Sequence, residues 1–176
     1  MKILITGSAG FIGFNLVKFL LDSSNHKIIG IDNINNYYSI NLKKKRLNVL
    51  KKYKKFSFYK IDINNKKAID RLFKKKKFDI VFNLAAQAGV RYSIENPKAF
   101  VDNNISGFYN ILDASIKYKI KKVLYASSSS VYGDSSDFPL KEKQLISPKN
   151  IYGLSKKINE EISEISSLYN KIDLVG

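Results

Sequence analysis

The chain has 176 residues, which is enough for one domain with a hydrophobic core. It has no cysteine and a single histidine, His26, so disulfides, thiolate metal sites and multi-histidine metal sites are excluded. Basic residues number 31 and acidic residues 15, and the resulting net charge of +16 raises the question of a polyanionic partner.

The N-terminal segment carries the most informative pattern. Residues 3–5 are an apolar run, typical of a strand buried on both faces of a parallel sheet. Glycine at positions 7, 10 and 13 then lets the backbone turn sharply and approach a pyrophosphate. A helix that begins near Phe11 directs its free N–H groups at that phosphate. The segment therefore predicts a strand, a turn and a helix that bind a dinucleotide, although glycine-rich turns alone are common.

Asp32 ends a second apolar strand, predicted over residues 27–32. An acidic side chain about 20 residues after the glycine turn accepts hydrogen bonds from the adenosine ribose and repels a 2′-phosphate. This favours NAD over NADP. The alternative is an aspartate that caps the following loop.

Strand and helix patterns alternate along the rest of the chain, which is typical of an α/β fold with a doubly wound parallel sheet, the Rossmann type. We find no repeat, no linker and no domain boundary, so residues 1–176 are interpreted as one dinucleotide-binding domain. We predict strands at 2–6, 27–32, 56–61, 78–84 and 121–127. We predict helices at 11–22, 39–52, 65–75, 99–118 and 148–169.

The last predicted helix has a clear start signal. Ser147 is a good N-cap, and Pro148 suits the first helical turn. Apolar residues from Ile151 to Leu168 recur at helical spacing, so one face of this helix belongs to the core. Residues 171–176 then indicate the start of a sixth strand, which leaves the sheet with an unfinished edge.

The charge distribution and the hydropathy argue against nucleic-acid and membrane partners. Lysines cluster at 43–45, 51–52, 54–55 and 74–77, where we expect surface helices. They lack interleaved aromatics and a recognisable nucleic-acid-binding module, so we expect no nucleic-acid partner. No apolar run approaches membrane-spanning length, and no signal peptide precedes the first strand. We therefore expect a cytoplasmic protein without a membrane partner.

Tyr152 and Lys156 lie four residues apart and share a face of the last predicted helix. Such pairs are common by chance, but this one follows a serine-rich strand end at 127–130, where a parallel sheet presents reactive groups beside its cofactor. A free tyrosine, with a pKa of about 10, is a poor base at neutral pH. A nearby ammonium and a positive nicotinamide favour the phenolate, and a serine hydroxyl holds the substrate oxygen.

Together these motifs resemble the extended short-chain dehydrogenase/reductase family, and within it the NAD-dependent nucleotide-sugar epimerases and dehydratases. The resemblance spans the whole chain. It rests on Thr6-Gly-Ser-Ala-Gly-Phe-Ile-Gly13, Asp32, Asp62-Ile63, Asn83-Leu-Ala-Ala86, Ser127–Gly133 and Tyr152-Gly-Leu-Ser-Lys156. Two further stretches are similar to those of UDP-glucuronate 4-epimerases: Asp32-Asn-Ile-Asn-Asn-Tyr-Tyr38 and Ala85-Ala-Gln-Ala-Gly-Val-Arg-Tyr-Ser-Ile-Glu-Asn-Pro97.

The resemblance implies roles for individual residues. The pyrophosphate would be held by Gly7, Gly10, Phe11, Ile12 and Gly13. The adenosine ribose would be held by Asp32 and Asn33, with Asp62 and Ile63 flanking the adenine. The rest of the cofactor groove would be lined by Leu84, Ala85, Ala86 and Asn103. Ser128 matches the catalytic Ser/Thr, Tyr152 the base, and Lys156 the residue that orients the ribose and favours the phenolate.

The implied reaction is redox-neutral inversion at C4 of a UDP-sugar, most closely UDP-glucuronate to UDP-galacturonate. Tyr152 takes the 4-hydroxyl proton, NAD⁺ takes and returns the C4 hydride, and the 4-keto sugar turns over in between. Arg91 is a candidate for the substrate carboxylate or diphosphate, or is a surface arginine without a ligand. Dehydratases of the family use an acid pair directly after the catalytic Ser/Thr. This chain has Ser129 and Ser130 there, which argues against dehydration.

Family members carry a further C-terminal part that forms much of the sugar-nucleotide pocket, and we find none after Gly176. The alternative function is therefore a catalytically silent NAD-binding fragment or interaction module. Family members also commonly pair through two helices, here 99–118 and 148–169, which implies a homodimer.

Overall fold

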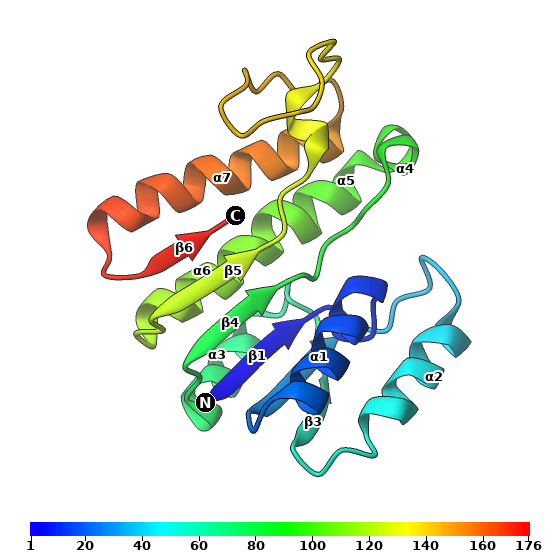
Figure 1. The fold of residues 1–176 in the computed structure, drawn as a ribbon, viewed down its shortest axis with the longest axis vertical. Coiled ribbons are helices and arrows are strands. Elements are labelled where there is room, and N and C mark those ends of the chain that lie inside the picture. Colours follow the sequence, from blue (N-terminus) through cyan, green and yellow to red (C-terminus); the bar gives the residue numbers. More distant parts are fainter.

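The computed structural model describes all residues 1–176, and its centre is a single sheet of six parallel strands (Figure 1). The strands are β1 (Lys2–Thr6), β2 (Lys27–Asp32), β3 (Phe56–Lys60), β4 (Ile80–Asn83), β5 (Lys122–Tyr125) and β6 (Asp173–Val175). Their order across the sheet is β3–β2–β1–β4–β5–β6. This is the strand order of the Rossmann fold, with its switch point between β1 and β4, where ligands bind. The predicted fold class is confirmed.

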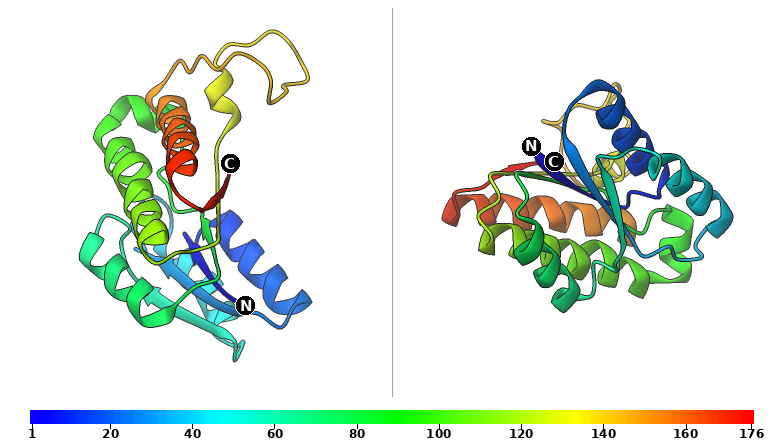
Figure 2. Two further views of the ribbon diagram at one scale, coloured as in Figure 1. Left: turned by 90° about the vertical axis from the view of Figure 1, so that its left-hand side faces the viewer. Right: turned by 90° about the horizontal axis from the view of Figure 1, so that it is seen from below.

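The helices cover both faces of the sheet (Figure 2). One face carries α1 (Phe11–Ser23) and α2 (Ile40–Leu50), and their Val17 and Leu47 join the core with Ile3 and Ile28. The other face carries α3 (Lys66–Lys76), α6 (Phe108–Lys117) and α7 (Ile151–Tyr169).

The largest core cluster lies under that second face. Fourteen buried residues pack there, among them Leu4 of β1, Phe73 of α3 and Ile111 of α6. Strand residues on both sides of the switch point contribute to it, so the helices of this face hold the two sides together. The groove between β1 and β4 therefore sits on a rigid base.

The sixth strand is confirmed at its predicted place. Residues Asp173–Val175 pair in parallel with Lys122–Leu124 of β5, and Ile172 before them is buried in the main core. The strand is short and forms one edge of the sheet, and Figure 1 shows the C-terminus at that edge.

The start of α7 differs from the prediction. The helix begins at Ile151 rather than Pro148, because the side chain of Asn150 caps it by accepting a hydrogen bond from the Gly153 N–H at 2.8 Å. Ser147 and Pro148 therefore lie before the helix. The Ser-Pro signal was wrong, and the asparagine two residues later is the N-cap.

The predicted helix at 99–118 is a composite. It consists of α5 (Pro97–Phe100), a π-helical segment η1 (Val101–Gly107) and α6, which follow one another without a break. Two short helices were not predicted: α4 (Val90–Glu95), directly before α5, and a 3₁₀ turn η2 (Ser129–Tyr132) after β5. No helix combines the length and the apolar character that crossing a bilayer requires.

Candidate functional site

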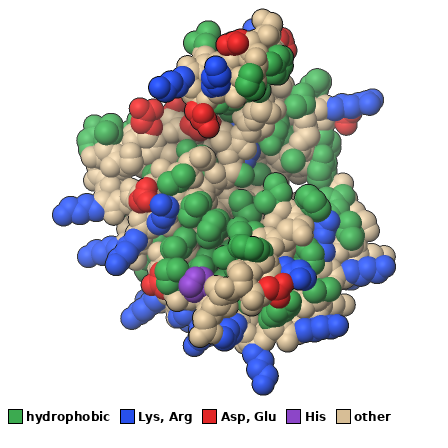
Figure 3. All heavy atoms as spheres, viewed as in Figure 1, with side chains coloured by type: hydrophobic (Ala, Val, Ile, Leu, Met, Phe, Trp, Pro, Cys, Tyr) green, Lys and Arg blue, Asp and Glu red, His purple; other side chains and the backbone are tan.

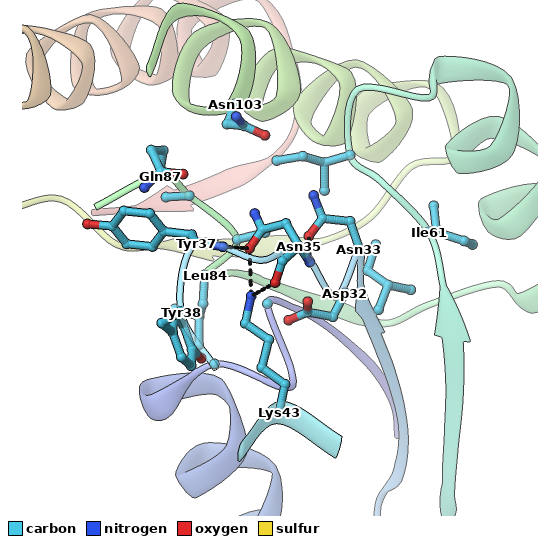
Figure 4. Close-up of a pocket in the computed structure, with 16 residues that line it drawn as sticks. Asp32, Asn33, Asn35, Tyr37, Tyr38, Lys43, Ile61, Leu84, Gln87 and Asn103 are labelled. Atoms are coloured by element: carbon cyan, nitrogen blue, oxygen red, sulfur yellow. Dashed lines mark hydrogen bonds between the residues drawn. The ribbon is translucent and has the colours of Figure 1, made fainter. Parts of the chain in front are cut away.

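A groove opens where the carboxyl ends of β1, β2 and β4 meet (Figure 4). Nine of the predicted cofactor residues line it: Gly7, Gly10, Asp32, Asn33, Ile63, Leu84, Ala85, Ala86 and Asn103. The fold therefore brings most of the expected dinucleotide site to one place in the structure.

The glycine turn is built for close approach. Gly7 has a φ of +68°, and a Cβ there would lie 2.9 Å from the backbone nitrogen of Ala85. A Cβ on Gly13 would lie 2.2 Å from the Gly7 carbonyl oxygen, so only glycine lets α1 pack on the turn. Both positions are closed to any larger residue.

The N-terminus of α1 suits a phosphate. Its N-cap, Gly10, offers no side-chain hydrogen bond to the first helical turn. The N–H groups of Phe11, Ile12 and Gly13 are therefore without a side-chain acceptor, and helix geometry gives them no intrahelical partner. The side chains of Phe11 and Ile12 are mostly exposed and do not line the groove, so these residues act through the backbone. The donor set fits the pyrophosphate of a dinucleotide.

Asp32 is buried at the groove wall, and both of its oxygens accept backbone hydrogen bonds. Oδ2 accepts from the Ala9 N–H at 3.1 Å and Oδ1 from the Ile34 N–H at 2.8 Å. The loop-capping alternative is thus also observed. Each carboxylate oxygen has a second lone pair, so capping the loop leaves Asp32 able to accept ribose hydroxyls.

The predicted adenine side is partly as expected. Asn33 and Ile63 line the groove, whereas Asp62 does not. The Asp62 carboxylate accepts from Asn33 Nδ2 at 2.9 Å and from the Asn64 N–H at 2.8 Å. Asp62 therefore holds Asn33 in place from behind the groove wall.

The loop between β2 and α2 and the first turn of α2 supply groove residues that were not predicted. Asn35, Tyr37, Tyr38 and Lys43 all line the groove (Figure 4). Tyr37 and Tyr38 belong to the stretch that resembles UDP-glucuronate 4-epimerases, which was the available signal for them.

Lys43 was expected among surface lysines, and that expectation was wrong. It is 4% exposed, and its Nζ donates to the carbonyl and to Oδ1 of Asn35 at 2.9 and 2.6 Å. It also lies 4.4 Å from the centre of the Tyr38 ring. Burial lowers the pKa of Lys43, and the charge of Asp32 opposes that shift. This buried cation fixes the loop that faces the ribose side of the groove.

The three predicted catalytic residues gather beyond the carboxyl end of β5. Ser128 caps η2, with its Oγ accepting from the Ser130 N–H at 3.2 Å. Tyr152 lies in the first turn of α7. Its neighbour Gly153 lies so close to η2 that a Cβ there would be 2.4 Å from the Ser130 carbonyl oxygen. This contact brings the serine turn and the tyrosine helix together.

Lys156 is 4% exposed and donates from Nζ to the Ala126 carbonyl oxygen at 2.8 Å. Burial lowers the pKa of Lys156 to about 8. A lysine in this state gives up its proton more readily than an exposed one and keeps its head group fixed at the strand end.

A buried asparagine connects the groove to the catalytic helix. The Oδ1 of Asn104 accepts from the Gln87 N–H at 2.7 Å, and its Nδ2 donates to the Gln87 carbonyl and to Ser155 Oγ. The Ser155 hydroxyl in turn donates to the Tyr152 carbonyl at 2.7 Å. Gln87 lines the groove. Asn104 thus fixes the distance between groove and catalytic helix, a role for which the sequence holds no signal.

Arg91 lies on α4, outside the groove. Its side chain is 95% exposed and is 3.6 Å from Glu95 in an ion pair one turn along the helix. The structure places it with neither the groove residues nor the catalytic three.

A family model described as GDP-mannose 4,6 dehydratase matches residues 4–170. The chain belongs to this family. The match confirms the resemblance to the extended short-chain dehydrogenase/reductases of the nucleotide-sugar epimerase and dehydratase type. That resemblance rested on motifs that include the glycine turn and the spacing of Tyr152 and Lys156.

Individual relatives support the same placement. The chain is 47% identical to protein CapI of Staphylococcus aureus and 41% identical to a UDP-glucuronate 4-epimerase of Thermodesulfobacterium geofontis. These matches cover 97% and 91% of this chain, but 51% and 49% of the relatives. The chain therefore spans about half the length of the curated relatives that it matches.

A solved structure agrees. The UDP-glucuronic acid 4-epimerase of Bacillus cereus, in complex with UDP-glucuronic acid and NAD, superposes with a TM-score of 0.92 at 34% identity. The match covers 99% of this chain and 55% of that one.

Proposed function

We propose that this chain is the dinucleotide-binding part of an NAD-dependent nucleotide-sugar 4-epimerase that interconverts UDP-glucuronate and UDP-galacturonate. The observation that carries the proposal is the position of Ser128, Tyr152 and Lys156 at the end of β5, tied through Asn104 to a groove with a dinucleotide-type glycine turn.

The cofactor part rests on the groove. The free N–H groups of α1 suit the pyrophosphate, and Asp32 suits a ribose with two free hydroxyls. A 2′-phosphate beside the Asp32 carboxylate is repelled, which supports NAD rather than NADP. The complex of the Bacillus cereus relative holds NAD.

The catalytic part rests on three side chains. The Tyr152 phenolate accepts the proton of the sugar 4-hydroxyl, and the Ser128 hydroxyl donates to the same oxygen. Lys156, one helical turn after Tyr152, supplies positive charge that favours the phenolate. When bound, NAD⁺ supplies a hydride acceptor that makes the 4-keto sugar accessible and later reverses the oxidation.

The choice between epimerisation and dehydration rests on the two residues directly after Ser128. Ser129 and Ser130 have no carboxyl group and cannot act as an acid pair. The carboxylate bound to this segment, Glu160, accepts a hydrogen bond from Ser127. Ser129 and Ser130 therefore support an epimerase, although the matching family model is named after a dehydratase.

Glucuronate is the finer part of the proposal. It is supported by the relatives from Thermodesulfobacterium geofontis and Bacillus cereus. Arg91 is the side chain of this chain that we propose for the sugar carboxylate or the diphosphate. The ion pair of Arg91 with Glu95 is solvent-exposed and therefore weak. The guanidinium can thus leave Glu95 and pair with an anionic substrate group.

We further propose a homodimer formed through η1, α6 and α7. Exposed apolar side chains on these elements include Val101, Tyr109, Leu154, Ile165 and Leu168. The α7 members share one helical face, as a helix-to-helix contact requires. Sedimentation of the chain at micromolar concentration tests this: a monomer at every concentration would contradict it.

The test of function has two stages. Calorimetric titration of the 176-residue chain with NAD⁺, and with NADP⁺ for comparison, should give saturable binding that favours NAD⁺. Turnover of UDP-glucuronate is measured next, with UDP-glucose and UDP-N-acetylglucosamine as competing substrates. Binding without turnover of any sugar would identify a catalytically silent NAD-binding module. Absence of binding by either dinucleotide would refute the cofactor assignment.

The variant Tyr152→Phe tests the proposed base. Removing one hydroxyl should abolish turnover while NAD⁺ affinity stays within about threefold, because general acid–base catalysis contributes about 10²- to 10⁴-fold. Ser129→Ala is the matched control, since it removes a nearby hydroxyl that has no assigned role. Turnover by Tyr152→Phe equal to that of the unchanged chain would eliminate this residue as the base.

A further inference from the structure

An aromatic contact links the loop that lines the groove after β2 to helix α4, which follows the groove residues after β4. Tyr37, from the loop after β2, packs on Tyr92 of α4, with ring centres 5.0 Å apart and planes tilted by 44°. Tyr37 lines the groove, and Figure 4 shows it extending away from Asp32 toward the side where Gln87 lies. The contact therefore joins the β2 side of the groove to the β4 side.

The segment before α4 leaves room for Tyr37. Gly89 has a φ of +104°, and a Cβ at this position would lie 2.6 Å from the Tyr37 hydroxyl oxygen. Any other residue at position 89 would be strained and would displace the tyrosine. The Tyr92 hydroxyl, in turn, accepts a hydrogen bond from Asn96 Nδ2 at 3.0 Å.

The β2–α2 loop and α2 hold the backbone of Tyr37 in place. Asn35 Oδ1 accepts from the Tyr37 N–H at 3.4 Å, and the buried Lys43 fixes Asn35 through two hydrogen bonds. The adjacent Tyr38 turns the other way, and its hydroxyl donates to the Ala9 carbonyl in the glycine turn at 3.4 Å. The two tyrosines thus point to different sides of the groove from one anchored loop.

The contact continues to the catalytic tyrosine. Tyr92 packs on Phe100, and Phe100, which is fully buried, meets the ring of Tyr152 edge-on at 6.0 Å. Three aromatic rings, those of Tyr37, Tyr92 and Phe100, therefore connect the ribose side of the groove to the proposed base.

We propose that Tyr37 and Tyr92 form a latch across the bound dinucleotide, which must open for the cofactor to enter or leave. The inference rests on the proposed cofactor and adds two residues to its site. A redox-neutral reaction needs the reduced cofactor to remain in place until the hydride has returned. A latch over the groove serves that need directly, because it lengthens the residence time of the reduced form.

A latch and a simple ligand contact differ in kinetics. A side chain that only contacts the cofactor changes the dissociation rate constant and leaves association alone. A latch that is closed in the resting protein retards both, so its removal raises both rate constants and changes Kd less than it changes the dissociation rate.

The experiment is stopped-flow fluorescence with NADH. Association is followed on mixing NADH with the protein, and dissociation on mixing the NADH complex with excess NAD⁺. We expect Tyr37→Ala and Tyr92→Ala each to raise the dissociation rate constant by about tenfold, the factor that corresponds to about 1.4 kcal/mol. The association rate constant should rise in both variants, and the double variant should exceed neither single variant appreciably, because the two rings share one contact.

Two variants serve as controls. Tyr37→Phe keeps the ring and should keep both rate constants within about twofold. Tyr169→Ala removes a tyrosine that is 83% exposed at the end of α7 and should change neither. Unchanged rates in both alanine variants, additive effects in the double variant, or a rise in dissociation alone would each overturn the latch. If the unchanged chain fails to bind NADH, the cofactor assignment fails first and the latch fails with it.

Discussion

The two halves of the sheet differ in how the helices cover them. In β1 and β2 nearly every residue is buried, since helices lie on both faces. In β4 and β5 buried and partly exposed residues alternate, so only the face toward α6 and α7 is fully covered. Figure 3 shows apolar side chains at the surface beside α1, on the part of this face that α1 and α2 leave uncovered.

This difference shows that the cofactor site and the catalytic site are held in place by different interactions. The glycine turn and Asp32 stand on strands that are held from both faces, and the pyrophosphate site is thereby fixed by the core. Ser128, Tyr152 and Lys156 stand on the half that is covered from one face, and their geometry depends on polar links such as Asn104 to Ser155. Substitutions in the two halves should therefore have different effects.

The largest effect on stability is expected from a leucine-to-alanine substitution, which we compare between the two halves of the sheet. Leu4→Ala in β1 removes a side chain with no exposure and should lower the free energy of unfolding by about 3 kcal/mol. Leu124→Ala in β5 removes a side chain on the open face and should cost about 1 kcal/mol or less, because no packed cavity is left. Denaturant unfolding of the two variants measures both values. Equal costs would break the comparison.

The next effect concerns the buried charge of the catalytic half. The folded-state pKa of Lys156 is about 8, below its ordinary 10.5, so between these pH values the unfolded chain binds more protons. The cost of burying the ammonium is fully present below pH 8 and disappears as the pH rises to 10.5. Stability should thus rise over this window by about 3 kcal/mol relative to Lys156→Met.

The control for this prediction is the adjacent residue. Lys157 is partly exposed and pairs with Glu161, so Lys157→Met should keep the rise in stability over the same pH window. Other groups titrate in this window, and only the difference between the two variants reports on Lys156. A rise that persists unchanged in Lys156→Met would show that this lysine is not the source.

The smallest effect is confined to the nucleotide half. Asp32→Ala should reduce the preference for NAD⁺ over NADP⁺ by about tenfold, because the carboxylate that repels a 2′-phosphate is lost. Titration of the variant with both dinucleotides measures the ratio. An unchanged ratio would remove Asp32 from the ribose site and leave it as the cap of the Ile34 loop.

The sequence predicted the parts of the fold that local patterns determine. Apolar strand runs and glycine spacing located β1, α1 and β2 to within about one residue. The start of α7 was misplaced because Ser147-Pro148 and Asn150 are both good start signals, and only the folded chain shows which side chain reaches the helix N–H groups. Short helix α4 has too few residues for a helical period to be read.

The site was predictable where the residue types and spacing of a motif indicate its role, as for Gly7 and Asp32. Lys43 was not, because a lysine in a run of lysines looks exposed, and its burial results from how α2 packs beside the β2 loop. Asn104 was not, because its partners Gln87 and Ser155 are 17 and 51 residues away in sequence. Contacts of this kind arise only from tertiary structure.

The π-helical segment between α5 and α6 has a consequence for how the gene can change. Within it, consecutive residues serve different neighbours: Asn103 lines the groove, while Asn104 is buried against Gln87 and Ser155. A π-helical turn holds one residue more than an α-helical turn, so deleting one residue between 101 and 107 would let the segment close into an α-helix. The core face of α6, with Phe108 and Ile111, would then stay on the sheet, whereas the present placement of Asn103 and Asn104 would be lost. Single-residue deletions in this segment should thus keep the fold and impair the groove, whereas deletions in the exposed loop at 134–146 should affect neither.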